Sequence, residues 1–342
     1  MLDTVSGLLS QELAIDLGTA SAQVAVPGRG AACREPSAVA YRSEGQGRRS
    51  LLAAGASARA MLGRTPAGIQ VVRPVRDGMV ADYQAAEDLL RFLLRRLGRK
   101  PVVGPGALFA LGAGVTDVER RAVREFSEKA GIRRTRFIDK SICAALGAGL
   151  PLAAPEGNMV VDVGAGTVQV AVISLGGLVH ARSACAAGDA MDAALVRWIE
   201  AEHGLLVGAG TAEALKLRLG AALPGLRSGY ASVAGLDRER GFPRRIELPA
   251  EQVALALQPV VAEIVAAIVG ALERIPPELA GDVADKGLLL CGGAAQLLGL
   301  DEAIGQRTRL PVVLAEEPMA TVVAGAARAL ELADELGGLV SD

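Results

Sequence analysis

The stretch AIDLGTASAQVAV, residues 14–26, returns as VVDVGAGTVQVAV at residues 160–172. Each copy has an apolar run, an Asp-x-Gly step, a few small or hydroxyl residues and then Gln-Val-Ala-Val. This pattern predicts a strand, a tight turn and a second strand that returns beside the first. Because the phrase recurs only after nearly half of the chain, it indicates a duplicated domain and not a short-period solenoid.

The turns of the two hairpins predict a phosphate-binding site. Small side chains leave the backbone N–H groups free to surround an anion. Asp16 and Asp162 stand at the strand ends, where a carboxylate can hold the water ligands of Mg²⁺. The alternative is a structural duplication without a ligand, but core packing does not require a carboxylate at both strand ends, since a buried unpaired charge is costly.

Composition limits the classes of protein that this chain can belong to. Its 342 residues suit about two domains. The net charge of −2 gives no general attraction to nucleic acid, so we expect no nucleic-acid partner. The four cysteines are scattered, and with two histidines they match no familiar zinc spacing, which indicates buried thiols in a reducing compartment. We find no uninterrupted apolar run of the ~18–20 residues that a membrane span needs and no secretory signal, and therefore expect a cytosolic protein.

Helical patterns alternate with strand patterns along the rest of the chain, which predicts the α/β class. A third glycine phrase, KGLLLCGGAAQLLGL at residues 286–300, predicts a strand, a turn and then a helix N-terminus, an arrangement suited to an anion or a nucleoside. Helices are expected in five segments, namely 82–100, 116–131, 139–151, 188–204 and 248–279.

These motifs together resemble the actin superfamily and, within it, the MreB-type bacterial actins. The repeated phrase resembles the two phosphate motifs, and GLLLCGGAAQLLGLDEAI resembles the adenosine motif. REPSAVAY, MLGRTPAGIQVVRPVRDGMVADY, VTDVERRAVREFSEKAG and RSACAAGDAMDAAL are further phrases of the same family. The similarity runs from about Glu12 to Glu331, so the family assignment rests on several phrases in the right order.

The resemblance implies an actin-like fold with two duplicated ribonuclease-H-like halves around a nucleotide cleft. The first half would comprise residues 1–148 and 321–342, with a small subdomain at about 33–77. The second would comprise residues 149–320, with a small subdomain at about 184–250. The resemblance also implies ATP and Mg²⁺ as cofactors, homopolymer filaments and a location in the cytoplasm on the inner face of the membrane. Its implied partners are cell-wall elongation proteins, and its implied role is to determine rod shape by guiding cell-wall synthesis.

Site residues transfer by matching position. Asp16 and Asp162 would face the metal through water. The matched nucleotide-binding residues are Gly18, Thr19, Ala20 and Ser21 in the first turn, Gly164, Ala165, Gly166 and Thr167 in the second, Glu213, Ala214, Leu215 and Lys216 on the ribose and adenine side, and Gly292, Gly293, Ala294 and Ala295 against the nucleoside. Without the family match, Glu213 and Lys216 would be taken for a solvated helix face.

One departure from the family bears on catalysis. The family's catalytic Glu, which orients the attacking water, is replaced by Lys140 in IDKSICAALGAGLP, and Asp139 keeps the preceding acid. A lysine near phosphate cannot accept a proton, although it can neutralise charge on the terminal phosphate. Thr167 and Lys140 are thus the candidate catalytic residues, and we expect slow ATP hydrolysis. Asp139 should point away from the site, and the alternative for Lys140 is a side chain in solvent.

Two segments could contact the membrane. Residues 1–10 would place Leu2, Val5, Leu8 and Leu9 on one helical face, without basic residues to attract anionic lipid, and a disordered tail is an equal alternative. RFLLRRLGR, residues 91–99, matches the region of the family's apolar membrane loop, and the alternative is a buried helix face.

Other functional classes stay open at this point. A chaperone-type or sugar-kinase-type clamp shares the superfamily fold, but the chain has no recognisable substrate domain or sugar-pocket Asp. A nucleotide-binding or nucleotide-insensitive scaffold is a third reading, and fold alone does not separate them.

Overall fold

The two copies of the repeated phrase form the same hairpin in two separate sheets. The computed structural model describes residues 12–98, 104–332 and 338–341. In the first sheet, β1 (Glu12–Leu17) pairs antiparallel with β2 (Ser21–Val26), and in the second, β11 (Asn158–Val163) pairs antiparallel with β12 (Val168–Ser174). The register is equivalent, since Asp16 lies opposite Gln23 and Asp162 lies opposite Gln169.

Each hairpin belongs to a five-stranded sheet of the same topology. The first has the order β10-β9-β1-β2-β3 and the second the order β13-β12-β11-β17-β18. In both, the third strand continues the antiparallel meander, and the two strands on the other side of the hairpin are parallel to its first strand. The remaining strands of the two sheets are β3 (Gly30–Pro36), β9 (Gly106–Leu111), β10 (Arg134–Asp139), β13 (Gly177–Ala184), β17 (Leu288–Cys291) and β18 (Val312–Leu314). The duplication inferred from the repeat is thus visible in the strand order.

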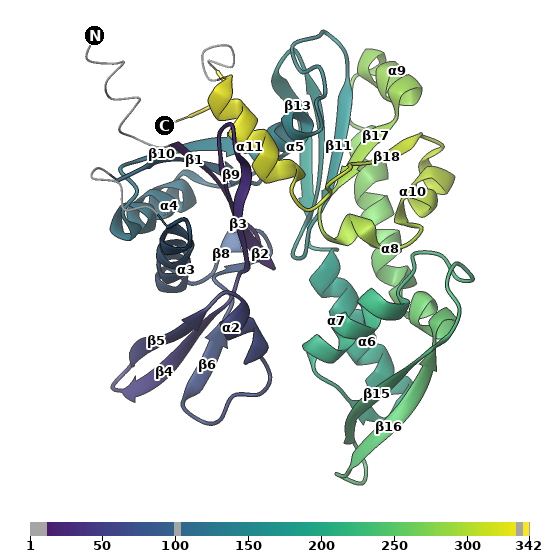
Figure 1. The fold of residues 1–342 in the computed structure, drawn as a ribbon. Helices are drawn as coiled ribbons and strands as arrows, with labels where there is room; N and C mark the ends of the chain where they lie inside the picture. Colours follow the sequence, from purple (N-terminus) through teal and green to yellow (C-terminus); the bar gives the residue numbers. More distant parts are fainter. Residues whose placement is uncertain (1–11, 99–103, 333–337, 342) are drawn as a thin grey trace.

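A smaller sheet extends from each half (Figure 1). The first is β5-β4-β6, formed by β4 (Val39–Gly45), β5 (Arg48–Ala54) and β6 (Ile69–Val72) with α2 (Ala56–Ala60). The second is β14-β15-β16, formed by β14 (Leu205–Leu206), β15 (Tyr230–Asp237) and β16 (Pro243–Pro249). A short pair, β7 (Val75–Arg76) and β8 (Met79–Val80), connects the first small sheet to α3.

Four of the five expected segments each form one helix, but a single helix over residues 248–279 is wrong, because the chain leaves the helix after Leu272 and starts a new one at Pro277. Asp82 caps α3 (Tyr83–Arg96), and Thr116 with Glu119 forms a capping box on α4 (Asp117–Ala130). The other helices are α5 (Lys140–Gly147), α6 (Gly188–His203), α7 (Ala209–Leu219), α8 (Ala250–Leu272), α9 (Pro277–Lys286), α10 (Leu300–Thr308) and α11 (Thr321–Glu331).

Helices α5 and α11 lie together between the two large sheets (Figure 1). Their apolar residues form one core with strand residues of both sheets, such as Leu108 and Leu289. The helices can approach this closely because a side chain at Gly325 would collide with the Cys143 carbonyl, and one at Gly147 would collide with the Thr321 carbonyl. This packing fixes the N-terminus of α5, where Lys140 is located.

The fold changes one of the two expectations about membrane contact. Leu93 is fully buried, and Phe92 and Leu94 pack against the same core, so a membrane loop at residues 91–99 is wrong for this part of the segment and the buried helix face is confirmed. The proposed anchor at residues 1–10 lies outside the described residues.

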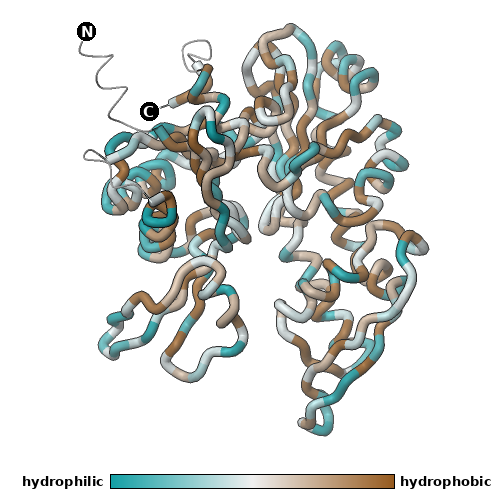
Figure 2. The backbone as a smooth tube through the Cα atoms, viewed as in Figure 1, coloured by the Kyte–Doolittle hydropathy of each residue, from teal (hydrophilic) through white to brown (hydrophobic). Residues whose placement is uncertain are grey.

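Among the described helices, α8 alone is long and apolar enough to cross a membrane. It contains no uninterrupted apolar run of that length, because Gln258 and Glu263 lie within it, and so it was not expected from the sequence. Half of its apolar window is buried, and its buried residues belong to the core of the second half. Figure 2 shows hydrophobic colour along α8 and along the central strands of both sheets.

Candidate functional site

The turns of the two hairpins have the same local structure. The Gly18 N–H donates to the Ser21 carbonyl at 2.9 Å, and the Gly164 N–H donates to the Thr167 carbonyl at 2.9 Å. Each bond closes a turn over two residues with small side chains, Thr19 and Ala20 or Ala165 and Gly166. Both turns therefore have the tight geometry with small side chains that the repeat predicts.

The two turns, which come from different halves, lie against each other. A Cβ added at Gly166 would lie only 2.6 Å from the Thr19 hydroxyl and 3.0 Å from the Asp77 backbone. The Gly78 N–H donates to the same Thr19 hydroxyl at 3.4 Å, and a Cβ at Gly78 would lie 3.2 Å from the Thr167 methyl. Thus the first turn, the second turn and the loop between β7 and β8 converge on one place.

The first residues of α6 connect the second turn to α7. The Gly188 and Asp189 N–H groups donate to the second turn, at the Gly164 and Ala165 carbonyls, at 3.2 and 2.7 Å. Gly188 in turn accepts from the Lys216 ammonium at 2.8 Å. Because that lysine belongs to α7, the contact joins the phosphate turn to the predicted adenine-side segment.

Lys216 also forms a nearly buried ion pair with Asp192, at 2.7 Å. Burial raises the pKa of Asp192, and the ammonium opposes that rise. Lys216 is therefore held in place by neighbours of the second turn and is not a solvated surface residue.

A cavity of about 190 Å³ lies between α7 and the late glycine turn. Among the predicted residues, Lys216, Gly293 and Ala294 line it. Met191 and residues 296–298 lie within phrases that resemble the family but were not assigned to the site. Sequence reasoning missed all of the remaining lining residues, namely Met191, Leu217, Gly220, Arg227, Gln296, Leu297, Leu298 and Met319. The cavity is mostly apolar with a few polar groups, as is typical of a nucleoside-base pocket.

The late glycine turn itself differs from the prediction. After β17 the chain forms a single 3₁₀ turn, Ala294–Gln296, and the next α-helix begins only at Leu300, so the expected helix N-terminus at this place is wrong. Gly292 has φ +94°, and a side chain there would collide with the Asp162 carboxylate and the Val163 carbonyl. The backbone therefore turns sharply beside Asp162 at a position that only glycine suits.

The four predicted residues on α7 lie in four different environments. Lys216 faces the small cavity, Ala214 is exposed, and Leu215 is buried in the core of the second half, so its side chain lines neither cavity. Ala295 is likewise buried in that core. Glu213 points into a second and larger cavity, of about 590 Å³, that both halves line.

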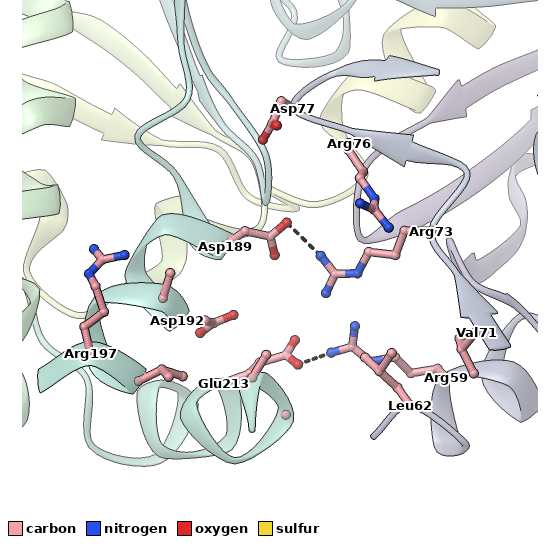
Figure 3. Close-up of a pocket in the computed structure, with 14 residues that line it drawn as sticks. Arg59, Leu62, Val71, Arg73, Arg76, Asp77, Asp189, Asp192, Arg197 and Glu213 are labelled. Atoms are coloured by element: carbon pink, nitrogen blue, oxygen red, sulfur yellow. Dashed lines mark hydrogen bonds and ion pairs between the residues drawn. The ribbon is translucent and has the colours of Figure 1, made fainter. Parts of the chain in front are cut away.

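Two ion pairs cross this larger cavity (Figure 3). Glu213 pairs with Arg59 on α2, and Asp189 at the start of α6 pairs with Arg73 at 2.7 Å. All four side chains are about one quarter to one third exposed. Sequence reasoning missed both arginines, because their partners lie more than 110 residues away and no local pattern connects them.

Lys140 is the first residue of α5, the helix that packs between the two halves. Its ammonium is 2.6 Å from the Asp16 carboxylate, and its side chain is only 16% exposed, so the alternative of a lysine in solvent is wrong. Burial alone would lower the pKa of Lys140, but Asp16 and Asp162 outweigh it, and the net pKa is raised. Lys140 therefore stays protonated at neutral pH.

Asp162 and Asp139, two other carboxylates near Lys140, have different surroundings. The pKa of Asp162 rises to about 6 because burial penalises its charged form; Lys140 opposes this rise and Asp16 adds to it. Asp139, by contrast, accepts a hydrogen bond from the Ser141 N–H at 2.7 Å and caps α5. Its carboxylate is used by the helix terminus, which confirms the expectation that it does not replace the missing Glu.

The residues around Asp16 and Asp162 do not fit a resident divalent ion. The described residues contain no group of three or more His, Cys, Asp or Glu side chains that could hold a metal by themselves, so a divalent ion here would depend on Asp16, Asp162 and the phosphates. The Asp16 oxygen that would face the water shell of Mg²⁺ is already paired with an ammonium. Since Mg²⁺ keeps several waters and prefers anionic oxygens, a fixed cation at this distance competes with it for the same carboxylate.

Two halves with equivalent strand order, joined by α5 and α11 and meeting at two glycine turns, define an actin-like protein. Solved structures agree with this class: MreB 5 of Spiroplasma citri bound to AMPPNP matches with a TM-score of 0.90 and 30% identity, over 95% of this chain and 97% of that one. A MamK double helical filament matches with a TM-score of 0.78 and 20% identity, over 94% and 99%, which supports the fold alone.

The sequence comparisons are more specific. The family model of the MreB/Mbl protein matches residues 10–337. The cell shape-determining protein MreB of Escherichia coli is 40% identical over 341 residues, which cover 99% of this chain and 98% of that protein. The chain belongs to the MreB/Mbl family.

Proposed function

We propose that this chain is a cytoskeletal protein that binds ATP between its two halves and forms filaments that determine rod cell shape by guiding cell-wall synthesis. The observation that carries the proposal is the contact between the two turns, where Thr19 of one half meets Gly166 of the other. Two turns with small side chains that meet from opposite halves suit the phosphates of a single nucleotide, because such side chains let backbone N–H groups approach an anion.

Further contacts support the same ligand. The cavity beside Lys216 and Gly293 adjoins the second turn through Gly188, so a base there and phosphates at the turns would belong to one molecule. The similarity to a relative bound to AMPPNP supports an adenine nucleotide. The cell-shape name of the Escherichia coli relative supports the cellular role.

Binding of a fluorescent ATP analogue tests the assignment of the cleft. Gly166→Asp should abolish binding, because its side chain would collide with Thr19 and put a carboxylate against phosphate. Gly281→Asp is the matched control, because it adds the same charge on α9 with open space around it. Equal binding by wild type and Gly166→Asp would place the nucleotide elsewhere.

We propose further that ATP is hydrolysed slowly. Lys140 stands where the family has its water-orienting Glu, and an ammonium paired with Asp16 can neither accept a proton nor orient water as a carboxylate does. Asp139 does not replace it, because it caps α5. A hydrolysis rate equal to that of an ordinary family member would refute this part.

Filament formation and membrane association are proposed from family membership. Sedimentation and electron microscopy with and without ATP test the filament, and a protein that stays monomeric at high concentration with ATP and lipid would favour a nucleotide-binding scaffold or clamp instead. Flotation with liposomes, with and without residues 1–10, tests the anchor, since two or more weak contacts in a filament can add up to stable binding. Equal flotation of both forms would remove residues 1–10 from the proposal.

A further inference from the structure

We propose that Lys140 serves as a built-in cation for Asp16 and Asp162, so that the protein binds its nucleoside triphosphate without requiring a divalent metal ion. This inference rests on the proposed nucleotide binding and concerns the charge of the same site. It starts from the 2.6 Å ion pair between the Lys140 ammonium and Asp16 at the junction of the two halves.

The charge at this junction is low. Asp16 and Asp162 contribute two negative charges and Lys140 one positive charge, which leaves a net charge of −1. A glutamate in place of Lys140 would give three carboxylates and a net charge of −3, which only bound cations could balance. With lysine in place, the chain itself balances one of the two carboxylate charges.

The ammonium is held in position and is not a mobile surface charge. Lys140 is the first residue of α5, whose N-terminus is capped by Asp139 and whose body packs closely on α11. Its side chain is 16% exposed, and that of Asp16 is 11% exposed. Displacing the ammonium by a hydrated ion would leave a buried charge without a partner, which is costly.

The two cysteines near this junction are poor metal ligands. Cys143 lies one turn further along α5 and Cys291 lies at the end of β17, and both thiols are buried. Burial raises their pKa well above the ordinary value, so they stay uncharged and are weak ligands. Buried, uncharged neighbours such as these thiols strengthen the attraction between Lys140 and Asp16, because little water is present to screen the two charges.

Nucleotide titrations with and without divalent ions test the proposal. The affinity of wild type for a fluorescent ATP analogue should change by less than about threefold between millimolar MgCl₂ and excess EDTA at matched ionic strength. Lys140→Glu should bind at least about tenfold more weakly in EDTA than in MgCl₂, because three carboxylates then face the phosphates. Lys129→Glu, the same charge change at an exposed lysine of α4, should behave as wild type.

Thermal unfolding of the protein without nucleotide gives a second reading that does not depend on ATP. MgCl₂ should raise the melting temperature of Lys140→Glu and leave those of wild type and Lys129→Glu unchanged. Wild-type binding that is lost in EDTA, or a wild-type melting temperature that rises with MgCl₂ as much as that of Lys140→Glu, would overturn the built-in cation. Absence of nucleotide binding in both buffers would instead overturn the proposed function, and the melting data alone would then decide about the cation.

Discussion

Replacing Lys140 by methionine removes the ammonium and keeps a side chain of similar length and flexibility. The structure predicts a large loss of stability, because Asp16 and Asp162 would then share a buried site with no positive charge. Removing one partner of a buried ion pair costs about 3–5 kcal/mol. We therefore expect the free energy of unfolding of Lys140→Met to fall by about 3 kcal/mol or more at pH 7.5.

The loss should depend on pH in a definite direction. In wild type, the pKa of folded Asp162 is about 6, above the value of about 3.9 expected in the unfolded chain. The folded state therefore binds more protons between about pH 4 and 6, and the contribution of Asp162 to stability falls as pH rises through this window. Without Lys140 the pKa of Asp162 rises further, so the window extends upward and the variant is penalised more at pH 7.5 than at pH 5.

Urea unfolding at pH 5 and pH 7.5 measures both effects. Lys129→Met, at an exposed lysine, controls for the loss of one positive charge and should stay within about 0.5 kcal/mol of wild type. If Lys140→Met is as stable as wild type at pH 7.5, or loses the same amount at both pH values, the ion pair does not balance the two aspartates and the reasoning fails.

Three further predictions concern other parts of the molecule. Gly325→Ala should lower the free energy of unfolding by about 1–3 kcal/mol in urea melts, because its methyl group would collide across the α5–α11 contact. The control Gly281→Ala, which has open space around it, should be neutral or stabilising. Equal stability of the two variants would refute the close approach of the helices. A double-mutant cycle of Arg59→Ala and Glu213→Ala should give a coupling of about 0.2–1 kcal/mol that weakens in high salt, because the pair is partly exposed, and a coupling near zero in low salt would mean that it does not connect the halves. Lys140→Glu should raise single-turnover ATP hydrolysis by at least about tenfold in the presence of MgCl₂, and an unchanged rate would contradict the assignment of slow turnover to this position.

Much of the fold follows from local signals in the sequence. The hairpins were predicted because an apolar strand, an Asp-x-Gly step and a second apolar strand each specify a local geometry. The ends of α3 and α4 were predicted because Asp82 and Thr116 cap them through their own side chains. Such features need no knowledge of distant contacts.

The features that the sequence could not predict depend on tertiary contacts. That Lys140 pairs with Asp16 follows from the packing of α5 between the sheets, and no pattern around residue 140 contains this information. The ion pair between Arg73 and Asp189 likewise joins residues far apart in the chain. The composition of the late glycine turn predicts a helix start, but the chain forms a 3₁₀ turn at Ala294–Gln296 and the next α-helix begins only at Leu300.

A cryo-electron microscopy map of the purified protein with ATP would test most directly whether one nucleotide joins the two halves. We predict polymers of this chain in which the phosphates lie between the turns 18–21 and 164–167, with the base in the cavity beside Lys216. Polymers without nucleotide density at these turns, or nucleotide bound at any other place on the chain, would contradict the account.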